Sequence, residues 1–393
     1  MSGPLTNGDA TRIGGETGLA ALPNRTTHIV GWGHEVPKAV ITNADLEKIV
    51  ETSDEWISTR TGIRERHIAG ADETTASMGA IAAARALAVA GVSADSVDLI
   101  VVATLTPDHP MPSTAVLVKE AIGSHRAAAF DLSAACSGFA YAYAVAHGFL
   151  TAGLGQRALV IGAESLSRVV DWSDRSTCVL FGDGAGAIVL DALDLHDDQN
   201  IATRPGTLSF ELSADPSGAF ALWIPGGSGD DADPLIKMDG AKTYVYATRT
   251  MAAVATTAIQ RAGLTVPEVD LVIPHQANLR IIEHVSKAID FPMEKIFVNL
   301  DRYGNTSAAS IPIALSEAVA AGRLKPGDVF CTVAFGGGYT SGAFVTRGDA
   351  DPAHGARAAA VDPSSIKIKR PEGGAKAAEV PAALKALLDA KGR

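Results

Sequence analysis

The sequence predicts an α/β protein in which one unit of strands and helices occurs twice. Residues 90–102, AGVSADSVDLIVV, match residues 262–274, AGLTVPEVDLVIP, at a constant offset of 172 positions. A glycine-rich segment leading into a strand closes each half, FGDGAGAIVL at 181–190 and FGGGYTSGAFV at 335–345. Repeats of this length indicate a duplicated unit.

The segments expected to form the central strands are apolar without alternation. They are VDLIVVAT at 97–104, RALVIGAE at 157–164 and DVFCTVAF at 328–335. Strands that helices cover on both faces have this character. We therefore expect sheets buried between helix layers.

Helices are expected at 42–50 and 74–90. Thr42 precedes Asp45 by three positions, as in a capping box, and Gly91 follows the second helix as a C-cap. The segment 191–239 is polar and rich in glycine and proline, which predicts long loops with edge strands.

The chain divides into four parts by composition and repeat. Residues 1–26 lack a hydrophobic period and are expected to be a flexible N-terminal extension. The two halves of the duplicated unit are expected at 27–195 and 196–347, with the fold beginning at His28. Residues 348–393 form a C-terminal appendage, in which one short helix around 380–390 is expected to lack the apolar face of a core element.

Composition narrows the class of protein. The chain has 393 residues, 47% of them hydrophobic, and a net charge of −11, which argues against general affinity for nucleic acid or anionic membranes. It has no apolar run of the roughly 18 residues that a membrane span needs, and no secretory signal at its start. Its three cysteines are far apart and odd in number. These features predict a cytoplasmic protein without disulfides.

Cys136 is the candidate nucleophile. It lies where a strand gives way to an apolar helix in DLSAACSGFAYAYAVAHGFL, residues 131–150. The first turn of a helix favours a thiolate, because the aligned peptide dipoles are positive there. The alternative is a small buried hydrophobic residue, which is how we interpret Cys178 and Cys331.

His275 and Asn305 are the other candidates. His275 follows a buried strand in VDLVIPHQANLRII, at the strand end where open α/β sheets place their sites. It aligns with Ala103 in the repeat, so only the second copy has a polar group there. Asn305 precedes a helix in DRYGNTSAASIP. The alternatives are a structural histidine and a plain helix N-cap.

A cysteine, a histidine and an asparagine at strand ends suit carbon–carbon bond formation through an acyl-enzyme. The thiolate accepts an acyl group from a thioester, and the other two groups donate hydrogen bonds to a second thioester as it becomes an enolate. This chemistry needs no metal. Cysteine hydrolases use the same residue types, so these alone leave both reactions open.

The chain resembles β-ketoacyl-acyl carrier protein synthase III, the initiating condensing enzyme of type II fatty acid synthesis and a member of the thiolase superfamily. The likeness runs from about His28 to Arg347. It rests on TNADLEK, TSDEWISTRTGIRERHI, AACSGFAYA, FGDGAGA, PHQANLRII, GNTSAAS and AFGGG. It implies a five-layered αβαβα fold of two βαβαβαββ halves, a homodimer, no cofactor, and acyl-coenzyme A and malonyl-acyl carrier protein as substrates.

The resemblance also implies roles for the catalytic residues. Cys136 would be the acylated nucleophile, and His275 and Asn305 would promote decarboxylation of malonyl-acyl carrier protein and stabilise the carbanion. The backbone N–H groups of Cys136 and Gly337 would form the oxyanion hole. Phe335 would shield the carboxylate that is lost.

Four residues are implied to contact coenzyme A. Trp56 and Arg175 match the positions that stack its adenine, for which an indole and a planar guanidinium are suited. Arg60 and Asn278 match other contacts along the same tunnel.

The match to the family is weaker at two places. Tyr244 and Val245 stand where the family has Phe-Lys, and that lysine is implied to help dock the acidic carrier protein. Arg280 and Lys287 on the next helix remain for docking. Met111, in HPMPS, falls where the family has a large apolar residue that enters the partner subunit's acyl pocket.

The predicted function is a decarboxylative condensation of a short acyl-coenzyme A with malonyl-acyl carrier protein. The alternative is a relative that loads a starter unit or transfers an acyl group in polyketide or other secondary metabolism. A degradative thiolase is disfavoured because Cys331 precedes Phe335 within a strand and cannot be its second cysteine. Retention of all three polar groups disfavours a non-catalytic scaffold, and the adenine-stacking pair disfavours a hydrolase.

Overall fold

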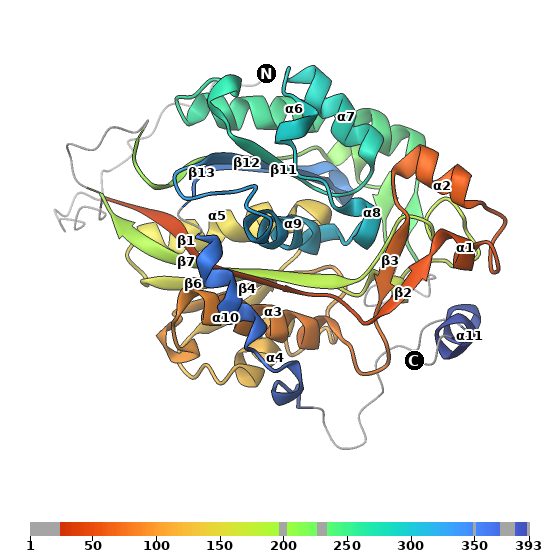
Figure 1. Ribbon diagram of the computed structural model, residues 1–393, viewed down its shortest axis with the longest axis horizontal. Helices are drawn as coiled ribbons and strands as arrows, with labels where there is room; N and C mark the ends of the chain where they lie inside the picture. Colours follow the sequence, from red (N-terminus) through yellow and green to blue (C-terminus); the bar gives the residue numbers. More distant parts are fainter. Residues whose placement is uncertain (1–23, 196–202, 226–233, 349–350, 370–381, 391–393) are drawn as a thin grey trace, which may run out of the picture.

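A computed structural model describes residues 24–195, 203–225, 234–348, 351–369 and 382–390. Two β-sheets alternate with three helix layers, which is the expected five-layered arrangement (Figure 1). One sheet lies between an outer layer with α6 and α7 and the central layer of α5 and α9, and the other lies between that layer and α3 with α4. The bounds of these helices are Thr75–Ala90 for α3, Thr114–Ala121 for α4, Gly138–Thr151 for α5, Gly240–Arg261 for α6, Leu279–Ala288 for α7 and Ser310–Ala320 for α9.

The two sheets share the order of four strands, and the first sheet has a fifth strand, β5, at its edge. The first has the order β1-β7-β6-β4-β5 and the second the order β8-β13-β12-β11. Strand β4 pairs parallel with β6, as β11 does with β12. The last two strands of each half, β6 with β7 and β12 with β13, pair antiparallel. The bounds are Arg25–Glu35 for β1, Leu99–Ala103 for β4, Ala128–Leu132 for β5, Arg157–Glu164 for β6, Gly184–Asp194 for β7, Gly206–Ala214 for β8, Leu271–Pro274 for β11, Val329–Gly336 for β12 and Thr340–Arg347 for β13.

The internal repeat is confirmed in the structure. Leu99 opens β4 and Leu271 opens β11, at equivalent places in the two sheets. The preceding helices α3 and α6 are each followed by a glycine in the left-handed conformation, Gly91 with φ 69° and Gly263 with φ 73°. A residue with a Cβ is strained there, so the repeated glycines mark the same helix end twice.

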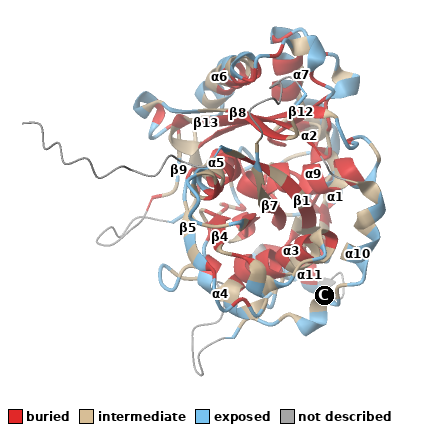
Figure 2. Ribbon diagram, turned by 90° about the vertical axis from the view of Figure 1, so that its left-hand side faces the viewer, coloured by how far each residue is buried: buried red, intermediate tan, exposed pale blue. Residues whose placement is uncertain are grey.

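The central helix layer joins the two halves. Figure 2 shows buried residues concentrated in the strands and in α5 and α9. A Cβ on Gly162 of β6 would lie 2.2 Å from the Ala308 carbonyl oxygen, and one on Gly186 of β7 would lie 2.6 Å from the Ile313 nitrogen. These glycines let the start of α9, from the second half, pack directly on the first sheet.

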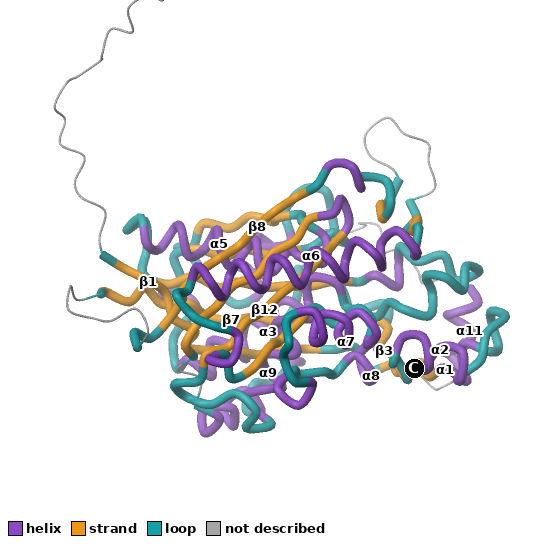
Figure 3. Tube along the Cα trace, turned by 90° about the horizontal axis from the view of Figure 1, so that it is seen from above, coloured by secondary structure: helices purple, strands orange, loops and turns teal. Residues whose placement is uncertain are grey.

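Smaller elements complete the fold beside the two sheets. The helix expected at 42–50 is shorter, since α1 spans Asn43–Leu46 with the predicted Thr42–Asp45 capping box and the chain then continues in turns. Seen from above, α1 and α2 lie at one end of the molecule (Figure 3). The remaining bounds are Ala39–Thr42 for β2, Glu65–Ile68 for β3, Leu222–Trp223 for β9, Lys237–Met238 for β10, Asp54–Thr61 for α2, Leu300–Tyr303 for α8, Ala356–Ala359 for α10 and Ala382–Ala390 for α11.

The C-terminal helix differs from its prediction. Helix α11 lies in the expected place, but its leucines Leu384, Leu387 and Leu388 are buried and belong to the same apolar cluster as Ile41 and Leu46. Figures 1 and 3 place α11 beside α1. The expectation that this helix lacks an apolar face is therefore wrong, because three leucines on nine residues supply one.

Two predicted segments fall mostly outside the described residues. These are the N-terminal extension expected at 1–26, of which residues 1–23 are not described, and the acidic stretch GGSGDDADP (226–234) of the expected loop segment 191–239, of which residues 226–233 are not described. The first strand begins at Arg25, slightly before the expected start at His28. Within the described ranges, no helix combines the length and apolar character needed to cross a membrane.

Candidate active site

Cys136 lies in a tight turn between β5 and α5. The turn is a 3₁₀ helix, η2 (Ala135–Ser137), and Ala135 adopts a left-handed φ of 47°, which is strained for a residue with a Cβ. The end of β12 approaches this turn closely, since a Cβ on Gly336 would lie 2.6 Å from the Cys136 nitrogen. The close approach fixes the turn that carries the thiol, which lies immediately before α5 (Gly138–Thr151) and not within its first turn as predicted.

The resting Cys136 thiol is protonated. Burial raises the pKa of Cys136 to about 12, the Ser307 hydroxyl lowers it, and the Glu164 carboxylate raises it further. A helix dipole is worth at most about 2 kcal/mol, or about 1.5 pKa units, so it does not cancel this rise. The expectation that the helix end favours a thiolate is wrong for the resting site, because burial dominates.

His275 is held neutral at the end of β11. Its backbone N–H donates to Val333 O at 2.8 Å, and its Nδ1 lies 2.7 Å from Ser310 Oγ. Burial lowers the pKa of His275 to about 3. Ser310 Oγ also accepts from the Gln276 N–H at 3.4 Å, and we assign the proton of the Ser310 hydroxyl to its contact with Nδ1. The imidazole proton then resides on Nε2, free to be donated to a substrate.

The backbone of Asn305 is hydrogen-bonded to the start of the glycine-rich segment 181–190 of the first half. Its N–H donates to Leu180 O at 2.8 Å, and its carbonyl accepts from the Gly182 N–H at 3.0 Å. Its side-chain oxygen accepts from the Ser307 N–H at 2.8 Å, which turns its NH₂ group away from that nitrogen. The N-cap of α9 is Ala309, so Asn305 does not cap that helix, but its bond to the Ser307 N–H caps the short 3₁₀ helix η7 (Ser307–Ala309) that leads into it.

The structure brings Cys136, His275 and Asn305 together around one cavity. All three line a space of about 220 Å³, with Phe335 and Asn278 also on its wall. Most of the lining is apolar, including Leu222, Met238, Ala247 and Met251. Three polar groups that are remote in the sequence therefore converge in a mostly apolar chamber.

Cys136 also borders a second cavity. This space of about 370 Å³ is lined by Gly337, Ser307, Leu166 and Trp223 together with Cys136. The thiol thus stands between two chambers, of which only the first contains His275 and Asn305. An acyl group on Cys136 could occupy one chamber while a second substrate enters through the other.

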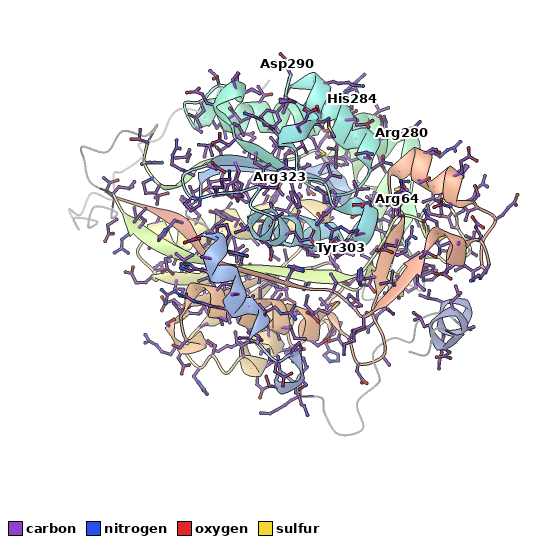
Figure 4. All side chains as sticks on the ribbon, in the orientation of Figure 1. Arg64, Arg280, His284, Asp290, Tyr303 and Arg323 are labelled. Atoms are coloured by element: carbon purple, nitrogen blue, oxygen red, sulfur yellow. The ribbon has the colours of Figure 1, made fainter. Side chains whose placement is uncertain are left out.

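The first cavity shares two lining residues, Tyr244 and Asn278, with a basic hollow at the surface. Asn278 caps α7, accepting from the Arg280 N–H at 2.9 Å, and lines both spaces. The hollow is also lined by Arg60 and Lys287. Figure 4 shows Arg280 and His284, another residue of this hollow, on the outer side of α7.

The guanidinium groups of Arg60 and Arg175 both lie over the ring of Trp56 on α2. The Cζ atoms of Arg60 and Arg175 lie 4.7 and 5.1 Å from the centre of its ring, within cation–π range. Arg175 is further held by a hydrogen bond of 3.1 Å to Glu51 O. Three of the four predicted coenzyme A residues therefore form one cluster, and the fourth, Asn278, shares the hollow with Arg60.

Met111 lies apart from the cavities. Its side chain is 86% exposed, and it lines neither chamber beside Cys136. Phe130, on the edge strand β5, is also exposed.

Sequence reasoning missed three polar residues around the candidates. Ser310 contacts His275, Ser307 lines the second cavity together with Cys136, and the Glu164 carboxylate raises the pKa of Cys136. Both serines lie within the GNTSAAS motif at 304–310, but the residues that they contact can be identified only from the structure. Among the described residues, no three His, Cys, Asp or Glu side chains are grouped to hold a metal ion.

Two family models match the chain. The model described as 3-oxoacyl-[acyl-carrier-protein (ACP)] synthase III matches residues 130–215, and the model of its C-terminal part matches residues 259–347. Cys136 lies in the first match, and His275 and Asn305 lie in the second.

Known proteins are similar over most of the chain. A β-ketoacyl-[acyl-carrier-protein] synthase III of Symbiobacterium thermophilum is 48% identical over 332 residues, covering 82% of this chain and 98% of the relative. The crystal structure of 3-oxoacyl-[acyl-carrier-protein] synthase III from Aquifex aeolicus has a TM-score of 0.76 and 48% identity, covering 82% of this chain and 99% of that one. The priming β-ketosynthase of the R1128 polyketide pathway has a TM-score of 0.79 and 34% identity, covering 85% and 99%. These matches confirm the fold expected from the motifs, and the chain belongs to the 3-oxoacyl-[acyl-carrier-protein] synthase III family.

Proposed function

We propose that this protein condenses a short acyl-coenzyme A with malonyl-acyl carrier protein, giving 3-ketoacyl-acyl carrier protein, CO₂ and coenzyme A. The observation that carries the proposal is the convergence of Cys136, His275 and Asn305 on one cavity. Family membership supports the same reaction.

In the first half-reaction, the Cys136 sulfur attacks the carbonyl carbon of acyl-coenzyme A. The bond from that carbon to the coenzyme A sulfur breaks, the acyl group remains on Cys136, and the proton that the Cys136 thiol loses is balanced by the one that coenzyme A gains as it leaves as a thiol. We assign the oxyanion hole to the backbone N–H groups of Cys136 and Gly337. In support, β12 comes close to the nucleophile at the adjacent Gly336, where a Cβ would lie 2.6 Å from the Cys136 nitrogen. The cavity lined by Cys136 and Gly337 then receives the acyl chain.

In the second half-reaction, the thioester carbonyl of malonyl-acyl carrier protein accepts hydrogen bonds from His275 Nε2–H and the Asn305 NH₂ group. The bond to the carboxylate breaks, CO₂ leaves, and the electron pair forms an enolate that these donors stabilise. The apolar ring of Phe335 on the cavity wall disfavours the charged carboxylate relative to CO₂. The enolate carbon attacks the acyl carbonyl, and the Cys136 sulfur leaves.

The cluster on α2 serves coenzyme A. Adenine would lie between the Trp56 ring and the Arg175 guanidinium, and two contacts of about 3.5 Å require about 7 Å between these groups. The Arg175 Cζ lies 5.1 Å from the ring centre, so it must move outward by about 2 Å as adenine enters. Arg60 and Asn278 would then line the path inward.

The basic hollow serves the carrier protein. Arg280 and Lys287 present positive charge at the mouth of the path to Cys136, where an acidic partner would dock. Glu283 lines the same hollow and would repel acidic groups of the carrier protein that come near it. The acidic groups of the carrier protein would therefore contact Arg280 and Lys287 and avoid Glu283.

We further propose that two copies associate through the edge strand β5. Its exposed Phe130, with Met111 and Val116 nearby in sequence, would be covered by the partner. Met111 would then reach the partner's acyl chamber, as the family resemblance implies. The reaction proposed here requires no cofactor, and the cytoplasmic location expected from the sequence stays a prediction.

A second candidate function is starter loading in polyketide synthesis. It is favoured by the similarity to the priming β-ketosynthase of the R1128 pathway, which matches with a TM-score of 0.79. The two functions share the acyl-Cys136 intermediate and differ in primer and carrier protein.

The test is a product assay with acetyl-coenzyme A and malonyl-acyl carrier protein, followed by mass spectrometry of the carrier. We expect 3-ketoacyl-carrier protein from the wild type and none from Cys136→Ser, since a hydroxyl is a far weaker nucleophile at neutral pH. Repeating the assay with primers of two to about eight carbons, straight and branched, separates the two candidates. Undiminished product from Cys136→Ser would overturn the proposal.

A further inference from the structure

Two turns from different halves of the protein meet beside the nucleophile. The first turn, residues 134–137, carries Cys136 and contains η2. The second turn, residues 336–340, lies between β12 and β13 and contains the 3₁₀ helix η8 (Gly337–Tyr339). The two N–H groups assigned to the oxyanion hole, those of Cys136 and Gly337, lie one on each turn. The separation of the turns therefore sets the separation of the two donors.

The hydroxyl of Thr340 joins the two turns. Ser137 Oγ donates to Thr340 Oγ1 at 2.7 Å, and Thr340 Oγ1 donates to Ala134 O at 2.9 Å. Within the described part of the chain, both hydrogen bonds that run from one turn to the other involve this hydroxyl. We call the hydroxyls of Thr340 and Ser137 the hydroxyl clasp. Ser137 is fully buried, so this contact is shielded from water.

Other contacts hold each turn to its own half of the protein. In the first turn, the Ser137 N–H and Oγ lie 3.2 and 2.8 Å from Ala134 O. In the second turn, the ring of Tyr339 stacks on Tyr246 of α6 at 4.0 Å, and its carbonyl accepts from the Asp215 N–H at 3.2 Å. These contacts fix the shape of each turn, whereas the hydroxyl clasp relates one turn to the other.

Both turns are strained and lie in close contact. Ala135 has a φ of 47° and Tyr339 a φ of 49°, in the left-handed region that disfavours residues with a Cβ. Such residues persist only where surrounding contacts hold them, and they cluster at active sites. A Cβ on Gly336 would lie 2.6 Å from the Cys136 nitrogen and 3.1 Å from Thr340 Oγ1. A shift of either turn would therefore displace a donor of the oxyanion hole.

We propose that Thr340 is a positioning residue for the oxyanion hole. This inference rests on the proposed acylation of Cys136 and on the assignment of the hole to Cys136 and Gly337. The hydroxyl clasp keeps the two turns at the separation at which both N–H groups reach the same thioester oxygen. Donors that are already in place stabilise the developing charge without reorganising during the reaction.

Thr340→Val removes the hydroxyl clasp with little other change. Valine keeps the branched Cβ and nearly the shape of threonine, so it suits the start of β13. Ser137 Oγ keeps its contact with Ala134 O, so its buried hydroxyl still has a partner. Gly337 O loses only a longer contact of 3.2 Å, which lies within the second turn. Thr340→Ser restores the hydroxyl and is the conservative variant.

The test is the single-turnover rate of Cys136 acylation by acetyl-coenzyme A, followed by intact-protein mass spectrometry. We expect the maximal rate of Thr340→Val to fall about 10- to 100-fold, since removing a donor outright costs about 100- to 1,000-fold. The concentration of acetyl-coenzyme A that gives half of the maximal rate should not change. Thr340→Ser should recover most of the rate. A wild-type rate in folded Thr340→Val, or equal losses in the two variants, would overturn the proposal.

Alkylation of Cys136 by iodoacetamide separates the oxyanion hole from the thiol. The sulfur displaces iodide from a CH₂ carbon in this reaction, so no oxyanion forms and the hole is not needed. Thr340→Val should therefore be alkylated at the wild-type rate. Equal slowing of alkylation and acylation would show that Thr340 holds the thiol and not the hole, which would contradict the proposal.

Thr26→Val is the matched control. Thr26 is buried on β1 of the first half, and its Oγ1 donates to Thr207 O on β8 of the second half at 2.7 Å. It lines neither cavity beside Cys136. This variant also loses a hydroxyl bond between the halves, and it should be acylated at the wild-type rate. A loss as large as that of Thr340→Val would mean that any loosening between the halves slows acylation, and the proposal would fall.

The two proposals fail in different ways. If the wild type itself forms no acyl adduct on Cys136, the proposed function fails. If the wild type is acylated and Thr340→Val is unaffected, only the role of Thr340 fails. If Thr340→Val does not fold, Thr340→Ala replaces it, with the same loss expected and the same wild-type rate as the contradicting result.

Discussion

Ser310→Ala should separate the two half-reactions. Ser310 Oγ lies 2.7 Å from His275 Nδ1, and both residues are buried. Without the hydroxyl, Nδ1 loses its partner and the imidazole is no longer held with its proton on Nε2. An unsatisfied buried polar atom costs about 1–3 kcal/mol. If the same free energy is added to the barrier for decarboxylation because His275 is no longer held in place, the rate falls about 5- to 150-fold, since 1.36 kcal/mol corresponds to a factor of ten.

Acylation of Cys136 should be unchanged in Ser310→Ala, because His275 acts only in the second half-reaction. The assay is release of labelled CO₂ from malonyl-acyl carrier protein, alongside acyl transfer from acetyl-coenzyme A followed by mass spectrometry.

Helix α9 offers a matched control for this variant. Ser316 makes the same kind of contact to His34 Nδ1 at 2.9 Å, and His34 lines neither cavity beside the thiol. Ser316→Ala should lower the free energy of unfolding by a similar amount and leave CO₂ release intact. Normal CO₂ release from folded Ser310→Ala, or equal losses in both variants, would refute the reasoning about the imidazole proton.

Three further predictions follow from other parts of the structure. Trp56→Ala should raise KM for acetyl-coenzyme A about 5- to 150-fold, since stacking a base on an aromatic ring is worth about 1–3 kcal/mol. The rate with an acetyl thioester that lacks adenine should not change, and equal effects on both thioesters would contradict adenine stacking. Leu387→Ala should speed hydrogen exchange in α11, because Leu387 is buried there, and Lys385→Ala on the exposed side should not; unchanged exchange in Leu387→Ala would mean that α11 is not docked. His147 has its pKa lowered by burial to about 4 from 6.5, so the unfolded chain binds more protons between these values and stability falls as pH drops through them. His147→Gln should flatten that fall in urea unfolding by roughly 3 kcal/mol, at 1.36 kcal/mol for each pKa unit, and an unaltered slope would exclude His147 as a source.

Much of the fold could be predicted because its signals are local. The glycines after α3 and α6 and the apolar strands β4 and β11 each depend on residues within a few positions, and the repeat shows them twice. Cys136, His275 and Asn305 could be proposed as candidates for the same reason, since each follows or precedes a recognisable element. Their convergence on one cavity follows from the shared topology of the two halves.

The parts that could not be predicted depend on contacts between distant segments. The rise in the pKa of Cys136 comes from burial and from Glu164 on a different strand, so the helix position alone gave the wrong direction. The neutral state and the tautomer of His275 depend on Ser310, on another helix. Helix α11 buries its leucines against elements more than 300 positions earlier in the chain, which no local pattern indicates.

The central claim is that Cys136 carries the acyl group while His275 drives decarboxylation. The most direct test is intact-protein mass spectrometry of the wild type and of His275→Ala, first with acetyl-coenzyme A and then with malonyl-acyl carrier protein. Both proteins should gain one acetyl group, mapped to Cys136 by peptide analysis, and only the wild type should lose it to ketoacyl product in the second step. An acetyl group on another residue, or equal discharge from His275→Ala, would contradict the account.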